Sequence, residues 1–225
     1  MSEDRLLAEY QKRFGQVFGA TFYKIEAHRV QLEVSWRYHE YLFGNGPEMV
    51  DMLNERAGAF FGHYQSMIFD HVLLGLSRLS DPPQSFGKTN ISMATLSNHL
   101  PKSDLQPDFD EMVIEYCNRV EFARDWRNRV IAHNDYALAT NQAHPIAIAT
   151  RKKVRAALDS LYDCMAFLSL ELDDAHIVDE IIHYADDVSL AQTIFLGNEA
   201  FAAARADRSL HKMTFPDWIM RTPAK

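Results

Sequence analysis

Glycine, proline and cysteine are scarce in this chain, and each shortage excludes a class of protein. Only 9 glycines and 8 prolines occur among 225 residues, which is too few for a collagen-like or linker-dominated chain and for the many turns of an all-β fold. Two cysteines, Cys117 and Cys164, cannot build a disulfide framework, and both fall in apolar helical patterns that favour small buried side chains. Helix is therefore the expected secondary structure.

Long apolar runs are also missing. The richest one is interrupted by Asp70, His71 and Arg78, so it falls short of the roughly 18 residues that a membrane span needs. The first residues place acids before bases and lead into no continuous apolar region, so we expect no signal peptide. These absences predict a cytoplasmic protein without a membrane partner.

The charge balance excludes a chain that is basic over its whole surface. The 31 acidic residues outnumber the 23 basic ones and give a formal net charge of -8. Any surface that binds nucleic acid must therefore be local. A hydrophobic fraction of 47% is enough for a sizeable core.

Apolar residues recur at helical spacing along most of the chain. Phe22, Ile25, Leu32, Trp36 and Phe43 lie on one stripe. The same period predicts further helices, and their approximate ranges are 47–79 with a possible bend at its glycines, 92–100, 109–133 and 154–172, with one or two more in the last fifty residues before a tail around Pro216. With no alternating strand, the pattern predicts an all-α, single up-and-down helical bundle in one domain, residues 1–225.

A Gly-Lys-Thr triplet at residues 87–89 suggests a phosphate-binding loop, but its spacing is wrong. Such a loop needs another glycine five residues before Gly87 and a preceding strand, whereas position 82 is Pro82 and the preceding segment is helical. We therefore assign it no nucleotide.

The end of the predicted helix 109–133 carries the most informative residues. Arg127 lies seven residues after Val120 and thus on the apolar stripe, where an unpaired guanidinium is costly. It should face an acid, a cluster of carbonyl groups, or a cleft or subunit interface that an anion can enter. His133 closes the helix, about 9 Å further along an ideal helix axis and about 120° around it. The two side chains do not touch on one ideal helix, but they can border one cleft, which a two-fold related neighbour would complete.

These residues resemble a known family. Arg127, Asn128, four spacers and His133 match the signature of HEPN-fold proteins, and the segments 76–82 and 87–92 look like the branch associated with abortive-infection U systems. The resemblance covers roughly residues 20–172, an HEPN-like core with the motif at 127–133. Residues 173–225 form a C-terminal helical extension that matches no family.

The resemblance implies a metal-independent endoribonuclease of HEPN type, a bacterial toxin or abortive-infection effector. HEPN domains often act across the cleft of a homodimer, and a toxin of this kind implies a neutralising antitoxin protein. Arg127, His133 and Asn128 would then be the catalytic residues, with no metal and no cofactor. The RNA 2′-OH would attack the phosphate and leave a 2′,3′-cyclic phosphate and a 5′-hydroxyl.

Further residues near the motif are candidates for binding the substrate. Arg124 and Arg129 belong to a run of arginines, and Arg151, Lys152, Lys153 and Arg155 add a second basic cluster that would contact an RNA backbone. Asp135 and Tyr136 follow the histidine and would support it. The alternative is that the basic residues form solvated ion pairs with acids such as Asp125 and Glu115, and that the residues after His133 only end the helix.

Two competing interpretations remain. Asp173 with His176, and Glu180 with His183, place acid and imidazole one turn apart as in helical metal sites, but both pairs lie on one segment, whereas such sites draw ligands from facing helices. The stronger competitor is a non-catalytic HEPN-like dimeric module that binds nucleotide or protein, with Arg127 and His133 as an interface cluster.

Overall fold

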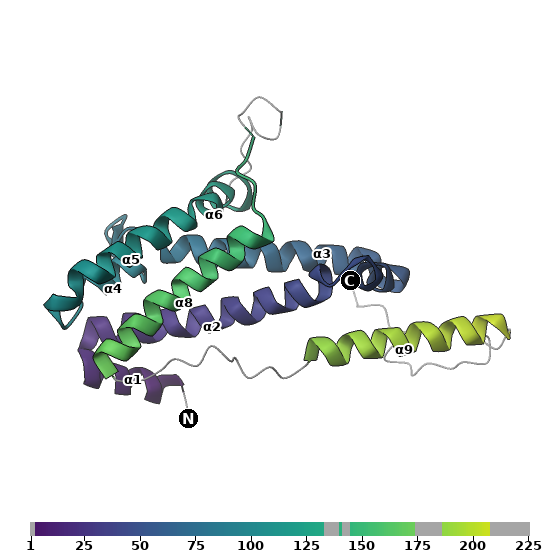
Figure 1. Cartoon of the computed structure of the whole chain (residues 1–225), viewed down its shortest axis with the longest axis horizontal. Helices are drawn as coiled ribbons and strands as arrows, with labels where there is room; N and C mark the ends of the chain where they lie inside the picture. The colour runs from purple at the N-terminus through teal and green to yellow at the C-terminus, as the bar shows by residue number, and fades with distance from the viewer. Residues whose placement is uncertain (1–2, 133–139, 141–144, 174–185, 208–225) are drawn as a thin grey trace. The chain divides into compact units, whose positions relative to one another are not determined.

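The computed structural model describes residues 3–132, 140, 145–173 and 186–207 (Figure 1). The helices run in chain order: α1 (Glu3–Phe14), α2 (Gln16–Gly44), α3 (Pro47–Leu79), α4 (Met93–Asn98), η1 (Ser103–Leu105), α5 (Gln106–Arg119), α6 (Glu121–Trp126), η2 (Arg127–Ile131), α8 (Arg151–Asp173) and α9 (Asp186–Ala206). Here η1 is a 3₁₀ helix and η2 is a π-helix. The all-α prediction is confirmed.

Contacts divide the chain into two compact units. Unit 1 comprises Met1–His39 and Gln65–Ile182, and unit 2 comprises Glu40–Tyr64 and His183–Lys225. The long helices α2 and α3 each contribute one part to unit 1 and one part to unit 2. The prediction of one domain over residues 1–225 stays a prediction.

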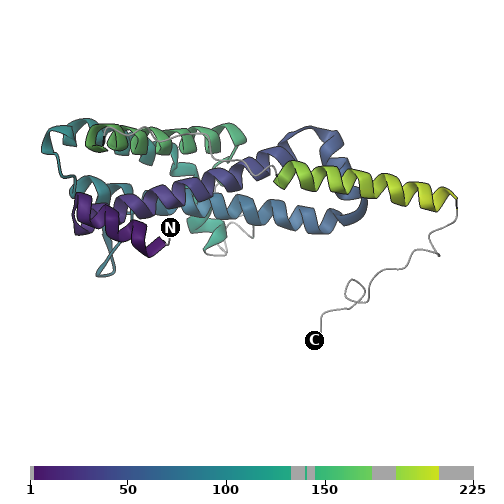
Figure 2. The same cartoon turned by 90° about the horizontal axis from the view of Figure 1, so that it is seen from below.

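The core of unit 1 lies between α2, α3, α5 and α8. In Figures 1 and 2 helices α5 and α8 lie side by side, and each buries an apolar stripe. Trp36 of α2 and Tyr116 of α5 are fully buried, and the Tyr116 hydroxyl donates to the Leu76 carbonyl of α3 at 2.7 Å. Burial of such large side chains supplies the main stabilising contribution of this unit.

The predicted stripe on α2 is confirmed from Phe22 through Ile25 and Leu32 to Trp36, which are all buried. Its last member, Phe43, is only half-buried. The break before α3 is also as predicted. Gly46 has a φ of +108°, which only glycine adopts readily, and Pro47 then opens the helix, where its missing N–H costs nothing.

Several sequence expectations need correction. The bend in α3 lies at Ala57 (φ −141°, ψ 37°), one residue before the first of the glycines. Residues 84–89 contain a two-stranded hairpin, β1 (Gln84–Ser85) with β2 (Lys88–Thr89), where no strand was expected. Its turn residues Phe86 and Gly87 both have positive φ, which suits a two-residue hairpin turn. Helix α1 was not predicted, although Leu6, Leu7, Tyr10 and Phe14 recur in it at helical spacing.

The single helix predicted over 109–133 is also wrong, because the backbone breaks at Val120 (φ −97°, ψ 6°). This break separates α5 from α6, and the last turn, η2, has π geometry.

Cys117 is half-buried and Cys164 is buried, and burial raises the pKa of the Cys164 thiol to about 12. Both cysteines keep their expected structural character as poorly ionised thiols.

No helix in the described parts of the chain combines the length and the apolar character that crossing a bilayer requires.

Candidate functional site

The arginine of the motif begins a π-helical turn. Arg127 is the first residue of η2, and the Ala132 amide donates to the Arg127 carbonyl at 2.8 Å, five residues apart. A π turn holds one more residue than an α turn and is frequent at functional sites. The side chains after Arg127 therefore do not follow the 100° step that an ideal α-helix predicts.

Arg127 faces an acid, one of the partners that its position predicted. Its Nη1 donates to the Asp81 Oδ1 at 2.7 Å, and its Nε donates to the Asn128 Oδ1 at 3.2 Å. The Arg127 and Asp81 side chains are only 21% and 23% exposed, so the ion pair lies at the edge of the core. The guanidinium is thus not inside the apolar stripe but is fixed at its rim, where part of it still faces solvent.

Asp81 is a site residue that sequence reasoning missed. It lies just after α3 and 46 residues before Arg127, and its carboxylate is the charged partner of the motif arginine. Asp81 belongs to the segment 76–82 that carried the family resemblance. The signal was therefore present, because the two segments of resemblance meet in space through this ion pair.

His133, Asp135 and Tyr136 lie outside the described residues, so the predicted approach of His133 to Arg127 stays a prediction. Residues 125 and 126, before this undescribed stretch, are joined to residue 147, after it, by hydrogen bonds. The Ala147 amide donates to the Asp125 Oδ2 at 2.8 Å, and the Trp126 indole donates to the Ala147 carbonyl at 2.7 Å. Residue 147 is thus held against the end of α6, by the two residues that precede Arg127.

The arginines around the motif divide into paired and unpaired ones. Arg129 contacts Asp125 at 3.6 Å, and Arg119 donates to Glu115 at 2.7 Å, as the alternative of solvated ion pairs predicted. Arg124 is half-buried and has no ion-pair partner among the described residues. Of the two predicted substrate contacts Arg124 and Arg129, only Arg129 therefore forms an ion pair among the described residues.

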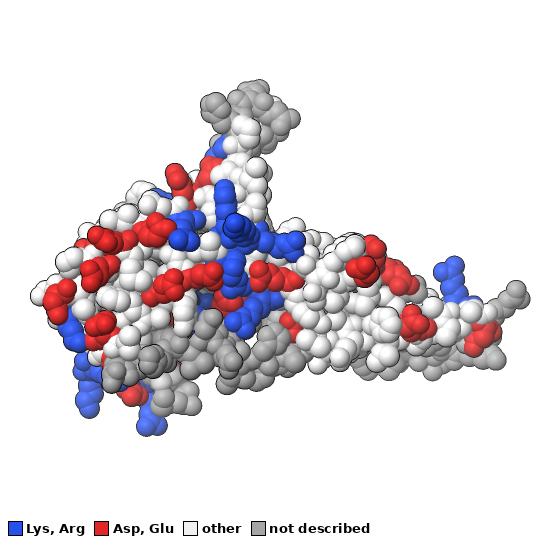
Figure 3. Space-filling model, viewed as in Figure 1, with Lys and Arg blue, Asp and Glu red and all other residues white. Residues whose placement is uncertain are grey.

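The second basic cluster is at the start of α8. Figure 3 shows Lys and Arg side chains gathered around this end of the helix, and Arg151, Lys152 and Lys153 are exposed there. Arg155 differs from them, because its Nη1 donates to both carboxylate oxygens of the buried Glu33 at 2.8 Å. The guanidinium of Arg155, whose side chain is 30% exposed, is thus already paired with a carboxylate of α2.

A pocket of about 550 Å³ lies between α5, α6 and the start of α8. Basic, acidic and amide side chains line it together with one aromatic ring, and Lys153 lies 5.8 Å from the centre of the Phe122 ring. Asn118, Arg119 and Glu121 line the same pocket, and Asp125 and Ala147 join it to the motif side. The two bases of the lining are matched by two acids, so the lining has no excess of positive charge.

Among the described residues, no group of three or more His, Cys, Asp or Glu side chains is arranged to hold a metal ion. Of the predicted alternative ligands, Asp173 forms an ion pair with Arg13. His176, Glu180 and His183 lie outside the described residues.

The chain was compared with known proteins. The family model of HEPN domains described as AbiU2 matches residues 18–189. None of the curated proteins and none of the solved structures that were compared matches the chain significantly.

Proposed function

Because this chain belongs to the AbiU2 family of HEPN domains, which is related to abortive infection, we propose that it is a metal-independent endoribonuclease and a toxin-like defence effector. The observation that carries the proposal is the position of Arg127. Its guanidinium is oriented by Asp81 and Asn128 at the start of a π turn that leads to His133. A partly exposed, pre-oriented guanidinium is suited to binding a phosphate.

Cleavage needs a proton acceptor, a proton donor for the leaving 5′-oxygen, and stabilisation of charge on the phosphoryl oxygens. The 2′-OH of RNA is the nucleophile, and His133 exchanges the proton, because an imidazole has an unperturbed pKa near 6.5. Arg127 stabilises negative charge on the phosphoryl oxygens. Asn128 keeps the guanidinium in place through its Oδ1. The products are a 2′,3′-cyclic phosphate and a 5′-hydroxyl.

The RNA backbone would pass along the basic side of unit 1. Arg151, Lys152 and Lys153 are exposed at the start of α8, next to the pocket that Phe122 and Lys153 line. Arg124 adds a guanidinium without an ion-pair partner among the described residues. The acidic balance of the whole chain then limits binding to this patch, which favours a selected RNA over any polyanion.

In this proposal two copies of the chain combine their motifs in one cleft. A two-fold axis would bring a second Arg127 and His133 opposite the first pair, which supplies the acid and the base from different subunits. A neutralising protein partner would restrain the cleavage of cellular RNA.

A non-catalytic module that binds nucleotide or protein is the second candidate, and one observation favours it. Arg127 already has an acidic partner inside its own chain, which is what a purely structural arginine needs. In that case Arg127→Ala and Asp81→Asn should both lower stability to a similar extent, and neither should remove an activity.

Three substitutions test the proposal in the full-length protein. His133→Ala and Arg127→Ala should lower RNA cleavage by about 10²- to 10⁴-fold while the variants keep the helical content and the oligomeric mass of the parent. Arg13→Ala is the matched control, because Arg13 is an exposed arginine of α1 that also pairs with an acid, Asp173, and does not line the pocket, so it should leave cleavage nearly unchanged.

Product analysis tests the mechanism separately. Cleaved RNA should carry cyclic phosphate ends, and EDTA should leave the rate unchanged. Recovery of 3′-hydroxyl ends, or full activity in His133→Ala, would refute the nuclease mechanism.

A further inference from the structure

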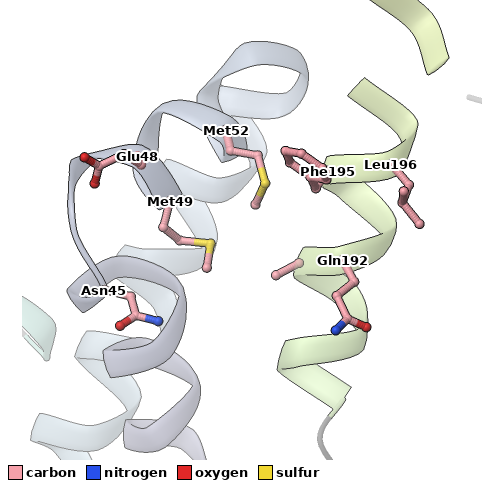
Figure 4. Close-up of a pocket in the computed structure, with 8 residues that line it drawn as sticks. Asn45, Glu48, Met49, Met52, Gln192, Phe195 and Leu196 are labelled. Carbon is pink, nitrogen blue, oxygen red and sulfur yellow. The ribbon is translucent and has the colours of Figure 1, made fainter. Parts of the chain in front are cut away.

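An apolar groove lies in unit 2, between the first turns of α3 and the middle of α9. Met49 and Met52 of α3 and Phe195 of α9 point toward one another across it (Figure 4). The groove has a volume of about 630 Å³, and its polar groups stand at its edges, at Asn45 and Gln192. The groove can therefore bind an apolar group, and the polar groups lie around its rim.

The walls of this groove are joined to each other within unit 2. The Asn198 amide donates to the Met52 carbonyl at 3.2 Å, and Asn198 is itself buried. Ile194 packs against the core formed by Leu42, Leu53 and Phe61. These contacts hold α9 to α3, so the groove is a formed feature of the unit.

Large apolar side chains remain open to solvent along the groove. Phe195 is 53% exposed and Leu196 is 65% exposed, while Met49 and Met52 are half-buried. A contiguous apolar surface with methionines and an aromatic ring is typical of a binding surface that adapts to its occupant.

The chain itself contains a segment of matching chemistry, which we call the tail. It comprises residues 208–225, which follow α9 and lie outside the described residues. Six of its side chains are large and apolar: Leu210, Met213, Phe215, Trp218, Ile219 and Met220. The tail carries four basic residues and one acidic residue, in a chain of net charge -8.

Charge and length both favour the tail as the occupant. The exposed acid Glu48 of α3 lines the groove, and it complements the bases of the tail. From Asp207 back to Phe195 the helix measures about 18 Å. The eight residues from Asp207 to Phe215 extend to about 26 Å, so the apolar part of the tail reaches the groove without strain.

We propose that the tail folds back along α9 and inserts its aromatic and methionine side chains into the groove between Met49, Met52 and Phe195. This contact removes the exposed apolar surface of α9 from water. It is independent of the proposed nuclease, because all the residues that make it belong to unit 2 and to the tail.

The fluorescence of Trp218 tests this proposal in the full-length protein. The spectrum of the parent minus that of Trp218→Phe isolates the emission of Trp218 from that of Trp36 and Trp126. We expect emission at a shorter wavelength than that of indole in water, and protection from quenching by iodide, because the ring is buried. If Trp218 is as open to iodide in the folded chain as in urea, the proposal is wrong.

Two matched substitutions locate the binding surface. Phe195→Lys places a charge in the groove, and it should raise iodide quenching of Trp218 several-fold and shift its emission to longer wavelength. Ile114→Lys is the control, because Ile114 is a comparably exposed apolar residue on α5 in unit 1 and should change neither signal. Circular dichroism checks that both variants are folded. Equal effects of the two variants, or none from Phe195→Lys, would overturn the proposal.

Dilution separates the tail of the same chain from the tail of a second copy. For docking within one chain, the protection of Trp218 should not change with protein concentration, while light scattering records the mass at each dilution. If the protection disappears as a dimer dissociates, the occupant belongs to another copy, and docking within one chain is refuted.

Discussion

The long helices of unit 1 enclose their largest apolar side chains, whereas helix α9 of unit 2 leaves several of its own exposed. In unit 1 the helices α2, α3, α5 and α8 enclose their largest side chains, and Trp36, Leu32 and Tyr116 are fully buried. In unit 2 helix α9 buries Asp187, Ala191 and Asn198 and leaves Leu190, Phe195 and Leu196 exposed.

The difference indicates where stability and binding are concentrated. A residue in unit 1 contacts side chains from several helices, so its removal leaves a cavity that its neighbours cannot fill. A residue on the open face of α9 has lost little contact with water and contributes little to folding. Unit 1 is therefore the scaffold for the motif, and unit 2 carries the apolar surface to which we propose that the tail binds.

The largest contrast should come from removing an aromatic side chain in each unit. Trp36→Ala should lower the free energy of unfolding by about 3–5 kcal/mol, because Trp36 is fully buried. Phe60→Ala in unit 2 should cost less than about 1 kcal/mol, because its side chain is 64% exposed. Urea unfolding followed by circular dichroism measures both. Similar losses would contradict the division into an enclosed and an open unit.

A pair of glycines gives the next largest effect, with opposite signs. A Cβ on Gly75 would overlap with the side chain of the fully buried Leu32 and lie 3.1 Å from the His28 Nε2. Gly75→Ala should therefore destabilise the protein by about 1–3 kcal/mol. A Cβ on Gly197 of α9 meets no atom within 4 Å, so Gly197→Ala should stabilise the helix by up to about 1 kcal/mol. Thermal unfolding of both variants is the measurement, and two shifts of the same sign would refute the contrast.

The smallest effect is a pH dependence that arises in unit 1. Burial lowers the pKa of His28, and the nearby His71 and Arg78 lower it further. Above about pH 6.5 the imidazole is neutral in both the folded and the unfolded chain, so it does not affect stability. As the pH falls below this value, the unfolded chain binds the proton first, and the free energy of unfolding decreases until the native state is protonated too.

His28→Gln should reduce this decrease, which urea unfolding at pH 7 and pH 5 measures. His63 in unit 2 offers the control, because it is an exposed histidine and His63→Gln should leave the pH dependence as it is. If the parent protein were more stable at pH 5 than at pH 7, and His28→Gln removed that gain, the predicted direction of the pH dependence would be wrong.

The helices were predictable to the extent that periodicity alone determines them. The stripe from Phe22 to Trp36 marks the buried face of α2, and Gly46 with Pro47 marks its end, because backbone freedom and a missing N–H are properties of single residues. The break at Val120 could not be predicted in this way. Val120 is fully buried and apolar, so it keeps the helical period while its backbone departs from helical angles.

The candidate site was predictable only in part. The motif arginine and its need for an acid followed from one guanidinium on an apolar stripe, but nothing local identified Asp81, 46 residues away, as the acid. The basic cluster was predicted as a unit, yet Arg155 pairs with Glu33 of α2, 122 residues away. Pairings of this kind depend on which helices become neighbours, which is decided by the packing of the whole unit.

The π turn at Arg127–Ile131 has a consequence for protein engineering and for the alignment of relatives. A turn that has taken in an extra residue can lose it again, and a deletion at exposed Val130 would restore ordinary α geometry. Such a deletion would swing the outgoing chain by about 100° around the helix axis and shorten the motif by one spacer. Insertions and deletions at this point should therefore be judged by whether the hydrogen bond from the Ala132 amide to the Arg127 carbonyl is kept, and not by the number of residues in the motif alone.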